Sequence, residues 1–362
     1  MTTMAFFGSS LLSSYWNGAA TYYRGIIRAL AARGVQVTFL EPDVWDRQKN
    51  RDMAPPDWCR VDVWEGSAEG LRRAASQAAA ADVVVVASGI GYEDDALRRA
   101  VLEQARPGAV RIWWDVDAPA TLADMRKDAA HPLRRDLPGF DMVFTYGGGQ
   151  PVIDGYRAMG ARDCVPIYNA LDPATHFPVP PDPRFTADLA FLGNRLPDRD
   201  VRVAEFLLHP ARMLPEFDFL LGGSGWDGCR LPDNLRAIGH VGTGAHNAFN
   251  VTPRAILNIA RDSMASCGFS PATRVFEAAG AGACLITDAW EGIEMFLTPG
   301  TEVLVARDGQ DVTEILTTLT AADAHRIGEA ARAHISTTHT YQNRAEQVVH
   351  RLAELQQREL QP

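Results

Sequence analysis

Short apolar runs alternate along this chain with longer segments whose apolar residues recur every three or four positions. In the first half, Asp82–Ser88 reads Asp-Val-Val-Val-Val-Ala-Ser, a continuous apolar run typical of a strand covered on both faces. Further strands are expected at 4–8, 35–40, 110–114, 142–145 and 165–168, and helices at 19–33, 68–80, 94–106 and 152–159. This alternation predicts a parallel, doubly wound α/β sheet.

The second half repeats the pattern after a proline-rich connection. Strands are expected at 188–193, 217–221, 255–259 and 283–287, a loop at 264–269, and helical structure from 321 to 359, with the last helix starting at 341. The chain of 362 residues is long enough for two domains. We therefore predict an N-terminal domain (1–171), a linker (172–184), a second domain (185–340) and a C-terminal helix (341–362).

Composition narrows the functional classes. The net charge of −10 disfavours a nucleic-acid partner. The five cysteines are scattered without a Cys-x-x-Cys pair, so we expect neither a disulfide framework nor a zinc site. Cysteines of this kind are consistent with a cytoplasmic location, where the environment is reducing. No apolar run reaches about 18 residues, so we expect no membrane span and no integral membrane contact. The sequence does not indicate an oligomeric state.

The stretch from Ser270 to Asp288 carries the most distinctive chemistry. Ser270 could cap a helix whose first residue is Pro271. Ser270, Arg274 and Glu277 would share one face of that helix, because they are spaced by four and three residues. A helix N-terminus and an arginine bind phosphate, and a carboxylate accepts hydrogen bonds from vicinal hydroxyls. The alternative is an ordinary surface pair of Arg274 and Glu277 beside an ordinary cap.

The motif Arg-Val-Phe-Glu-Ala-Ala-Gly at 274–280, followed by Gly282, a strand and Pro-Gly-Thr-Glu-Val-Leu at 299–304, resembles the donor half of CgeB-like glycosyltransferases, relatives of the group 1 glycosyltransferases. The resemblance implies the GT-B fold, with two facing Rossmann-like doubly wound domains and a C-terminal helix that crosses back to the first. It implies transfer of a sugar from a nucleotide diphosphate sugar, with UDP or dTDP expected, to a hydroxyl or other nucleophile. Of the two glutamates in the group 1 pattern, Glu277 matches the second; no acidic residue stands near the first, around Cys267–Phe269.

The resemblance and the helix argument together define a candidate donor site. Its members are Gly193, Asn194, Arg199, His240, Val241, Ser270, Thr273, Arg274 and Glu277. In the first domain, loops that follow strands would face the acceptor, because ligands of such sheets lie beyond the carboxyl ends of the strands. The acceptor-side candidates are Tyr15, Trp16, Asn17, Gly18, Tyr146, Gly147 and Asn169.

Asp115 and Asp117 follow an aromatic-rich strand and are the catalytic candidates. In the related family such a carboxylate faces the acceptor, and it could take the proton from an acceptor hydroxyl if the enzyme inverts. Asp117 could instead cap the helix that starts near Pro119. Asp-x-Asp is also a metal-binding signature in another glycosyltransferase fold, but the helix terminus and arginines already supply positive charge, so we expect no metal and no cofactor.

Two rival enzyme classes remain. A nucleotide-sugar epimerase or hydrolase on the same fold is the main alternative. A dinucleotide-dependent oxidoreductase is disfavoured, because the first strand–turn, Phe7–Leu12, lacks Gly-x-Gly-x-x-Gly.

Overall fold

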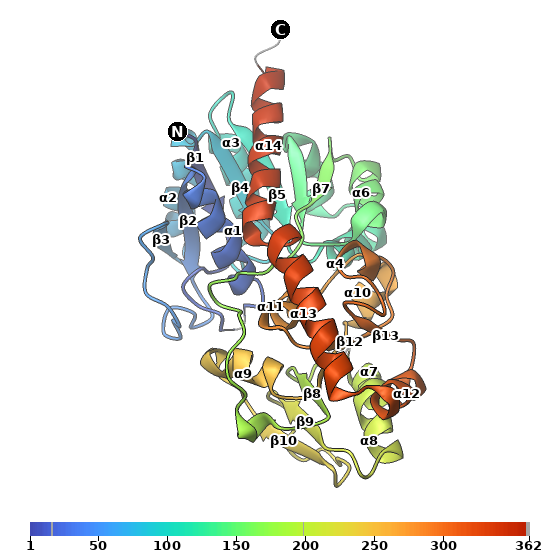
Figure 1. Cartoon of the computed structure of the whole chain (residues 1–362). Helices are drawn as coiled ribbons and strands as arrows, with labels where there is room; N and C mark the ends of the chain where they lie inside the picture. Colours follow the sequence, from blue (N-terminus) through green and yellow to red (C-terminus); the bar gives the residue numbers. More distant parts are fainter. Residues whose placement is uncertain (16, 198, 360–362) are drawn as a thin grey trace. The chain divides into compact units, whose positions relative to one another are not determined.

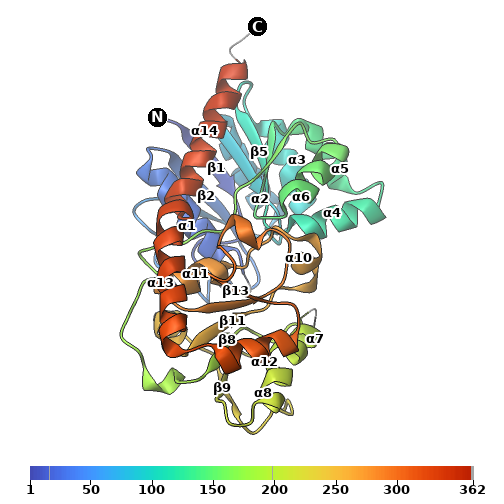
Figure 2. The same cartoon turned by 45° about the vertical axis from the view of Figure 1, so that its right-hand side comes forward.

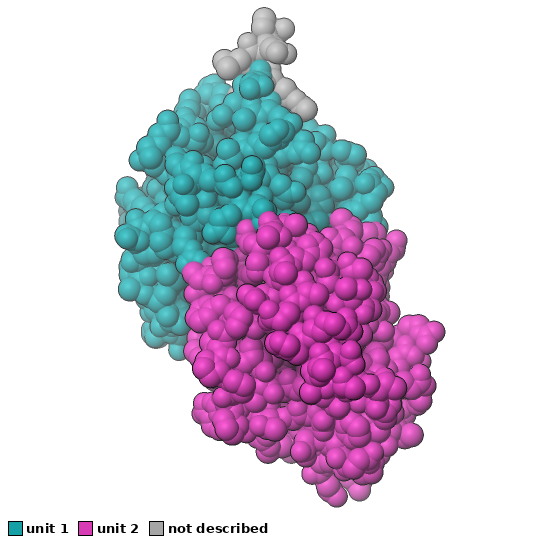
Figure 3. Space-filling view, viewed as in Figure 1, with its two compact units in different colours: residues 1–168, 341–362 teal, residues 169–340 magenta. Residues whose placement is uncertain are grey.

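The chain divides into two compact units (Figure 3). The computed structural model describes residues 1–15, 17–197 and 199–359. Unit 1 contains residues 1–168 together with 341–362, and unit 2 contains residues 169–340. The division between the units therefore follows residue 168, where the sequence had suggested residue 171.

Unit 1 is built on a seven-stranded parallel sheet with the order β3-β2-β1-β4-β5-β6-β7. The strands are β1 (Thr3–Phe7), β2 (Gln36–Asp43), β3 (Arg60–Glu65), β4 (Val83–Ala87), β5 (Val110–Asp115), β6 (Met142–Thr145) and β7 (Cys164–Pro166). Every residue of β4 is buried, as its unbroken apolar run predicted. Because all strands run in parallel, the loops after β1, β2, β4, β5 and β6 emerge at one edge of the sheet.

Helices cover this sheet (Figures 1 and 2). They are α1 (Ala20–Ala32), α2 (Ala68–Ser76), α3 (Asp94–Gln104), α4 (Ala118–Lys127), α5 (Pro132–Asp136), α6 (Gly149–Ala158) and α14 (Tyr341–Glu359). The C-terminal α14 lies against α1. Gly25 permits this approach, because a Cβ there would lie 2.2 Å from the ring of Tyr341. The predicted return of the last helix to the first unit is therefore confirmed.

Unit 2 contains a six-stranded parallel sheet with the order β10-β9-β8-β11-β12-β13. The strands are β8 (Leu189–Leu192), β9 (Phe219–Gly222), β10 (Leu235–Gly239), β11 (Ala255–Asn258), β12 (Leu285–Asp288) and β13 (Leu304–Ala306). The helices are α7 (Asp200–Val203), α8 (His209–Met213), α9 (His246–Val251), α10 (Asp262–Cys267), α11 (Thr273–Ala281), α12 (Gly309–Thr318) and α13 (Ala321–Thr338). Two doubly wound sheets, as predicted, are confirmed.

Local details differ from the expectations at two points. The segment 264–269, expected as a loop, is mostly the helix α10. The region 321–359 is helical as expected, and the last helix starts at Tyr341, after α13 ends at Thr338. The edge strand β3 was missed, since its polar residues Arg60, Asp62 and Glu65 give it no apolar run.

Within the described residues, no helix combines the length and the apolar composition needed to cross a bilayer.

Candidate active site

The helix α11 begins later than expected. Its first residue is Thr273, and Ala272, in the N-cap position, provides no side-chain hydrogen bond. The prediction that Ser270 caps this helix is therefore wrong. Ser270 is 6% exposed, and its hydroxyl has no hydrogen-bond partner among the described residues. The segment before the helix is held instead by Asn169, whose amide Nδ2 donates to the carbonyl oxygen of Pro271 at 3.3 Å.

Two arginines approach one aromatic ring at the end of β8. The guanidinium carbon of Arg274 lies 5.2 Å from the centre of the Phe191 ring, and that of Arg199 lies 5.3 Å from it. Arg274 also donates to the carbonyl oxygen of Leu192. Arg199 donates to the carbonyl oxygen of Asn194 at 2.5 Å. Residues separated by 75 positions in the sequence thus place two positive charges together, each oriented by backbone and ring contacts.

The electrostatics of Arg274 are unusual for an arginine. Burial, together with the positive charge of Arg199, lowers the pKa of Arg274 to about 10, although the charge of Glu277 opposes this change. Within the described part of the chain, no carboxylate forms an ion pair with Arg274. The free protein therefore holds two like charges side by side, and a bound anion would relieve their repulsion.

Gly193 makes this arrangement possible. A Cβ at this position would lie 2.9 Å from Nη2 of Arg199 and 2.9 Å from the Phe191 ring. Asn194 is exposed, and its side-chain oxygen accepts a hydrogen bond from the backbone N–H of Ser224 at 2.9 Å. Gly193 and Asn194 thus belong to the loop that holds Arg199.

Glu277 lies one turn after Arg274 on α11, with its side chain 22% exposed. Two histidines stand near it. Nε2 of His176 lies 3.9 Å from the Glu277 carboxylate oxygen Oε1. His246, on α9, bonds through Nε2 to the carbonyl oxygen of Val241 at 3.1 Å; burial lowers the pKa of His246, and the charge of Glu277 opposes that change. Sequence reasoning named neither histidine.

His240, a candidate for the nucleobase region, is exposed at the end of β10, whereas its neighbour Val241 is buried. Thr273, the first residue of α11, is half-buried. Six of the donor-site candidates therefore lie around β8 and α11: Gly193, Asn194, Arg199, Thr273, Arg274 and Glu277. Val241 lies beside them, because its carbonyl oxygen bonds to His246, which is near Glu277.

The two catalytic candidates differ sharply in environment. Asp115 is fully buried and accepts hydrogen bonds from the hydroxyl of Ser88 at 2.8 Å and from Tyr156. Its Oδ1 also accepts from the backbone N–H of Asp117 at 2.9 Å. Asp117 is half-buried in the N-cap position of α4, and its side chain makes no capping hydrogen bond. Asp115 thus organises the turn, and Asp117 is the carboxylate nearer to solvent.

The loop after β1 is built around internal hydrogen bonds. Asn17 is buried and donates through Nδ2 to the carbonyl oxygens of Ser10 at 2.8 Å and Ser13 at 3.0 Å. Gly18 borders open space. Trp16 lies outside the described residues. The remaining acceptor candidates are placed as follows: Tyr146 packs against Tyr22 with ring centres 4.9 Å apart, Gly147 is buried, and Asn169 lies in unit 2.

Comparison with known proteins bears on both the fold and the site. Residues 199–350 match a family model described as "Glycosyl transferase-like". A comparison with the curated proteins found no significant match.

Several solved structures share the fold over nearly the whole chain. Sucrose-phosphate synthase from Thermosynechococcus elongatus is 14% identical, with a TM-score of 0.69 over 98% of this chain and 99% of that chain. HepE from Anabaena, solved with UDP-glucose, is 13% identical, with a TM-score of 0.65 over 98% of this chain and 100% of that chain. A protein from E. coli named "Trehalose-6-phosphate", bound with UDP-2-fluoro glucose, is 10% identical, with a TM-score of 0.67 over 98% of this chain and 99% of that chain. The predicted GT-B architecture is confirmed.

A cavity of about 490 Å³ lies at the carboxyl edge of the unit 1 sheet, and of the residues around it sequence reasoning named only Tyr15. Tyr15, Trp45, Asp46 and Arg47 line it. Trp45 is 66% exposed, and its indole N–H donates to the carbonyl oxygen of Gly91 at 2.9 Å. Its backbone has a φ of 57°, in a region that bulky residues rarely adopt. The signal available in the sequence was a tryptophan in the loop that follows a strand.

Buried charges hold the loops beside this cavity. Glu41 of β2 is fully buried and accepts from the hydroxyl of Ser10 at 3.0 Å and from the backbone N–H of Leu12 at 3.3 Å. Arg47 is also buried and donates through Nη1 to the carbonyl oxygens of Ser9 at 3.0 Å and Ile90 at 2.9 Å. These contacts fix the loops after β1, β2 and β4 relative to one another.

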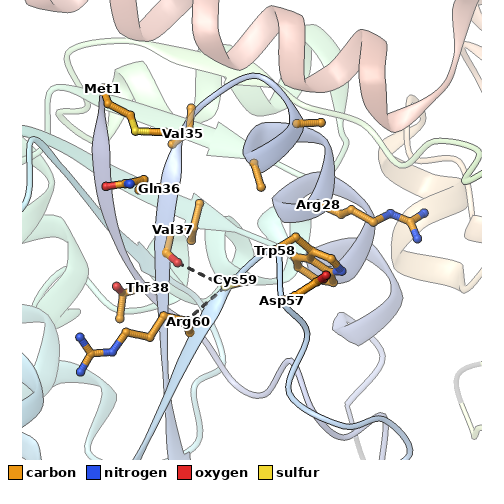
Figure 4. A pocket seen from close by; sticks show the side chains of 12 residues that line it. Met1, Arg28, Val35, Gln36, Val37, Thr38, Asp57, Trp58, Cys59 and Arg60 are labelled. Atoms are coloured by element: carbon orange, nitrogen blue, oxygen red, sulfur yellow. Dashed lines mark hydrogen bonds between the residues drawn. The ribbon is translucent and has the colours of Figure 1, made fainter.

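A second cavity in unit 1, of about 600 Å³, lies between α1 and the amino ends of β2 and β3 (Figure 4). Trp58, Cys59 and Arg28 are among the residues around it. Ligands of doubly wound sheets bind at the opposite, carboxyl edge, so this cavity is not a candidate for the active site.

Within the described residues, no group of three or more histidine, cysteine, aspartate or glutamate side chains is arranged to hold a metal ion.

Proposed function

We propose that this protein is a glycosyltransferase that takes a sugar from a nucleotide diphosphate sugar and transfers it to a hydroxyl or other nucleophilic acceptor. The single observation that carries the proposal is the pair Arg199 and Arg274, held 5.3 and 5.2 Å from one ring with no carboxylate paired to Arg274 in the described chain. Two arginines so placed suit a diphosphate, because each guanidinium can donate two parallel hydrogen bonds to phosphate oxygens.

The rest of the donor site follows from the same helix. No side chain caps the start of α11, so the backbone N–H groups of its first two residues are suited to a phosphate. Glu277 supplies a carboxylate one turn further along, suited to ribose hydroxyls. In the reaction, negative charge develops on the departing diphosphate, and donors fixed beforehand stabilise that charge. We propose that these groups act without a metal ion or other cofactor.

Unit 1 supplies the acceptor side in this proposal. Asp117, half-buried after β5, is the proposed general base if the anomeric centre inverts. Asp115 positions the turn through its bond from the backbone N–H of Asp117. The membership in the CgeB-like group and the cytoplasmic location belong to the same proposal.

Thermal unfolding with UDP, GDP, dTDP and ADP, each without and with magnesium, tests the donor site. A ligand that binds only the folded state stabilises it by about 2.7 kcal/mol at a hundredfold excess over its dissociation constant. We expect a raised midpoint with one of these nucleotides, independent of magnesium. No increase with any of them would contradict the proposal, and an increase that requires magnesium would contradict its metal-independent form.

Transfer itself is tested by incubating the corresponding nucleotide sugar with and without candidate acceptors. We expect release of the nucleotide diphosphate that depends on acceptor. Conversion of the sugar to its epimer, or release at the same rate without acceptor, would support the epimerase or hydrolase alternative instead.

A further inference from the structure

Side chains of three kinds line the cavity of about 490 Å³ at the carboxyl edge of the unit 1 sheet. Tyr15 and Trp45 are exposed aromatic rings, Arg47 is a buried cation, and Asp46 is an exposed carboxylate. The volume lies within the range of about 300–1,000 Å³ that is typical of small-molecule sites. The cavity therefore offers a ligand apolar ring faces, hydrogen-bond donors and a hydrogen-bond acceptor.

The two loops that carry the aromatic rings are fixed in place. The hydroxyl of Ser13 accepts a hydrogen bond from the backbone N–H of Tyr15 at 3.2 Å and donates to the carbonyl oxygen of Asn50 at 2.8 Å. This joins the loop after β1 to the loop after β2. The indole of Trp45 is held at its edge by the hydrogen bond from its N–H to Gly91, and it contacts no other aromatic ring among the described residues.

The backbone after β2 is strained at two residues that line the cavity. Trp45 and Asp46 have φ values of 57° and 55°, in the left-handed region that residues other than glycine rarely adopt. Such conformations persist only where the surrounding structure holds them, and they are concentrated at functional sites. Here they place an indole and a carboxylate from adjacent residues at the same cavity.

The guanidinium of Arg47 has hydrogen-bond donors that the protein does not use. Arg47 is 6% exposed, and its Nη1 donates to the carbonyl oxygens of Ser9 and Ile90. Neither its buried Nε nor its Nη2 has a hydrogen-bond partner among the described residues. A buried guanidinium with donors left over is suited to a ligand oxygen, because an unpaired buried donor costs free energy.

The charges around the cavity favour a neutral ligand over an anion. Burial lowers the pKa of Arg47, and the charges of Glu41 and Asp94 oppose this change, so nearby carboxylates already offset part of the arginine charge. Asp46 adds a further negative charge at the cavity wall. Its Oδ1 is paired with Nζ of Lys49 at 2.6 Å, and its Oδ2 accepts no hydrogen bond from the described residues.

A neutral sugar ring matches this set of groups. The C–H groups on one face of a pyranose pack against an aromatic ring, while the hydroxyls at its rim both donate and accept hydrogen bonds. Trp45 provides the ring face, Arg47 the donors and Asp46 the acceptor. A flat aromatic compound would leave the last two without matching groups.

We propose that this cavity is the acceptor subsite and that the acceptor is a neutral sugar, which stacks on Trp45 and hydrogen-bonds to Arg47 and Asp46. The acceptor role rests on the proposed function. In the transfer, a hydroxyl oxygen of this sugar bonds to the anomeric carbon of the donor, and the hydroxyl proton passes to the proposed base, Asp117. The bond from the anomeric carbon to the diphosphate oxygen breaks, and its electron pair leaves with the diphosphate.

Saturation-transfer NMR of the full chain, without and with UDP, tests the sugar site. The probes are the methyl glycosides of glucose, galactose, mannose and rhamnose, with glucose 6-phosphate as an anionic sugar and methyl 4-hydroxybenzoate as an aromatic compound. We expect at least one methyl glycoside to bind, with the strongest transfer to C–H protons of one ring face. Tighter binding of a disaccharide that ends in the same sugar would identify the end of a longer glycan as the acceptor, and equal binding a single sugar.

Variants assign the binding to the cavity. Trp45→Ala should weaken glycoside binding about fivefold, and Trp45→Phe, which keeps an aromatic face, should recover part of it. Asp46→Asn should weaken binding about threefold, because a neutral acceptor replaces a charged one. Trp58→Ala, at the amino-end cavity, is the matched control and should bind as the wild type does. Unfolding midpoints of the free variants separate loss of binding from loss of fold.

The outcomes separate this inference from the proposed function. If UDP binds but no methyl glycoside does, or if Trp45→Ala binds the glycoside as tightly as the wild type, the sugar site is refuted while the donor site stands. Binding confined to glucose 6-phosphate or to the aromatic ester also refutes it. If a glycoside binds in a Trp45-dependent way but UDP, GDP, dTDP and ADP do not bind, the proposed function fails and the acceptor role with it, although the cavity still binds sugar.

Discussion

Replacement of Arg274 by methionine tests the electrostatic account of the donor site in most detail. Methionine keeps a flexible stem of similar length and removes the charge. In the free protein, burial and the charge of Arg199 lower the pKa of Arg274 to about 10. The folded pKa lies below the value of an unfolded chain, so the charged form destabilises the fold at neutral pH. This cost decreases only as the pH rises above about 10.

The size of the effect follows from that change in pKa. A lowering of the pKa from the ordinary value of an arginine to about 10 corresponds to roughly 3 kcal/mol against the charged form. Loss of the bond to the Leu192 carbonyl oxygen and of the contact with Phe191 offsets much of the gain. We therefore expect Arg274→Met, without ligand, to unfold at the same temperature as the wild type or higher.

Nucleotide binding should respond in the opposite direction. A hydrogen bond from a charged group contributes about 1.5–3 kcal/mol, so we expect UDP to bind roughly 10- to 150-fold more weakly. Calorimetry measures the affinity, and thermal unfolding measures the stability of the free variant. Arg326→Met, at a side chain 61% exposed on α13, is the control and should change neither. Wild-type UDP affinity in Arg274→Met would refute the phosphate role.

Three further substitutions test other parts of the account. Gly193→Ala places a Cβ 2.9 Å from Arg199, and this overpacking should weaken UDP binding about fivefold or more. Gly244→Ala is the control, because a Cβ at Gly244 would have no atom within 4 Å. Equal UDP affinities of the two variants in calorimetry would contradict this account. Asp117→Asn should lower turnover about a hundredfold with little change in unfolding midpoint, and activity at the wild-type rate would exclude Asp117 as the base. Asp115→Asn should lower the midpoint, because an amide NH2 in place of Oδ2 cannot accept the buried hydrogen bond from the Tyr156 hydroxyl. Trp45→Ala should lower kcat/KM for the acceptor about fivefold and leave UDP affinity unchanged. Trp58→Ala, at the amino-end cavity, is the control. An unchanged kcat/KM in Trp45→Ala would show that Trp45 does not contact the acceptor.

The sheets could be predicted because a strand that is buried on both faces is a continuous apolar run in the sequence. The run at β4 and the shorter runs at β1 and β6 are apolar without interruption, and each became a strand. The edge strand β3 is half-exposed and carries charges, so it leaves no such trace. The start of α11 was misplaced because Ser270 and Pro271 satisfy the local rule for a helix start, whereas packing of Ser270 in the interior decided the outcome.

The candidate site could be predicted only in part, for a similar reason. Arg274 and Glu277 share a helix, so their spacing revealed them. Arg199 was found only through the family resemblance, because its contact with Phe191 joins two separate elements. His176 and Trp45 lie in segments without a periodic pattern, and their positions depend on turn hydrogen bonds and on contacts with residues distant in sequence.

Hydrogen–deuterium exchange of the full chain, with and without saturating UDP, tests the central claim most directly. The account predicts slower exchange in peptides that cover 191–199 and 268–280, where the backbone and arginines of the donor site lie. Peptides around Cys59, at the amino-end cavity, should be unaffected. Protection confined to the turn at Asp115–Asp117, or no protection anywhere at a UDP concentration that saturates the nucleotide-sugar reaction, would contradict the account.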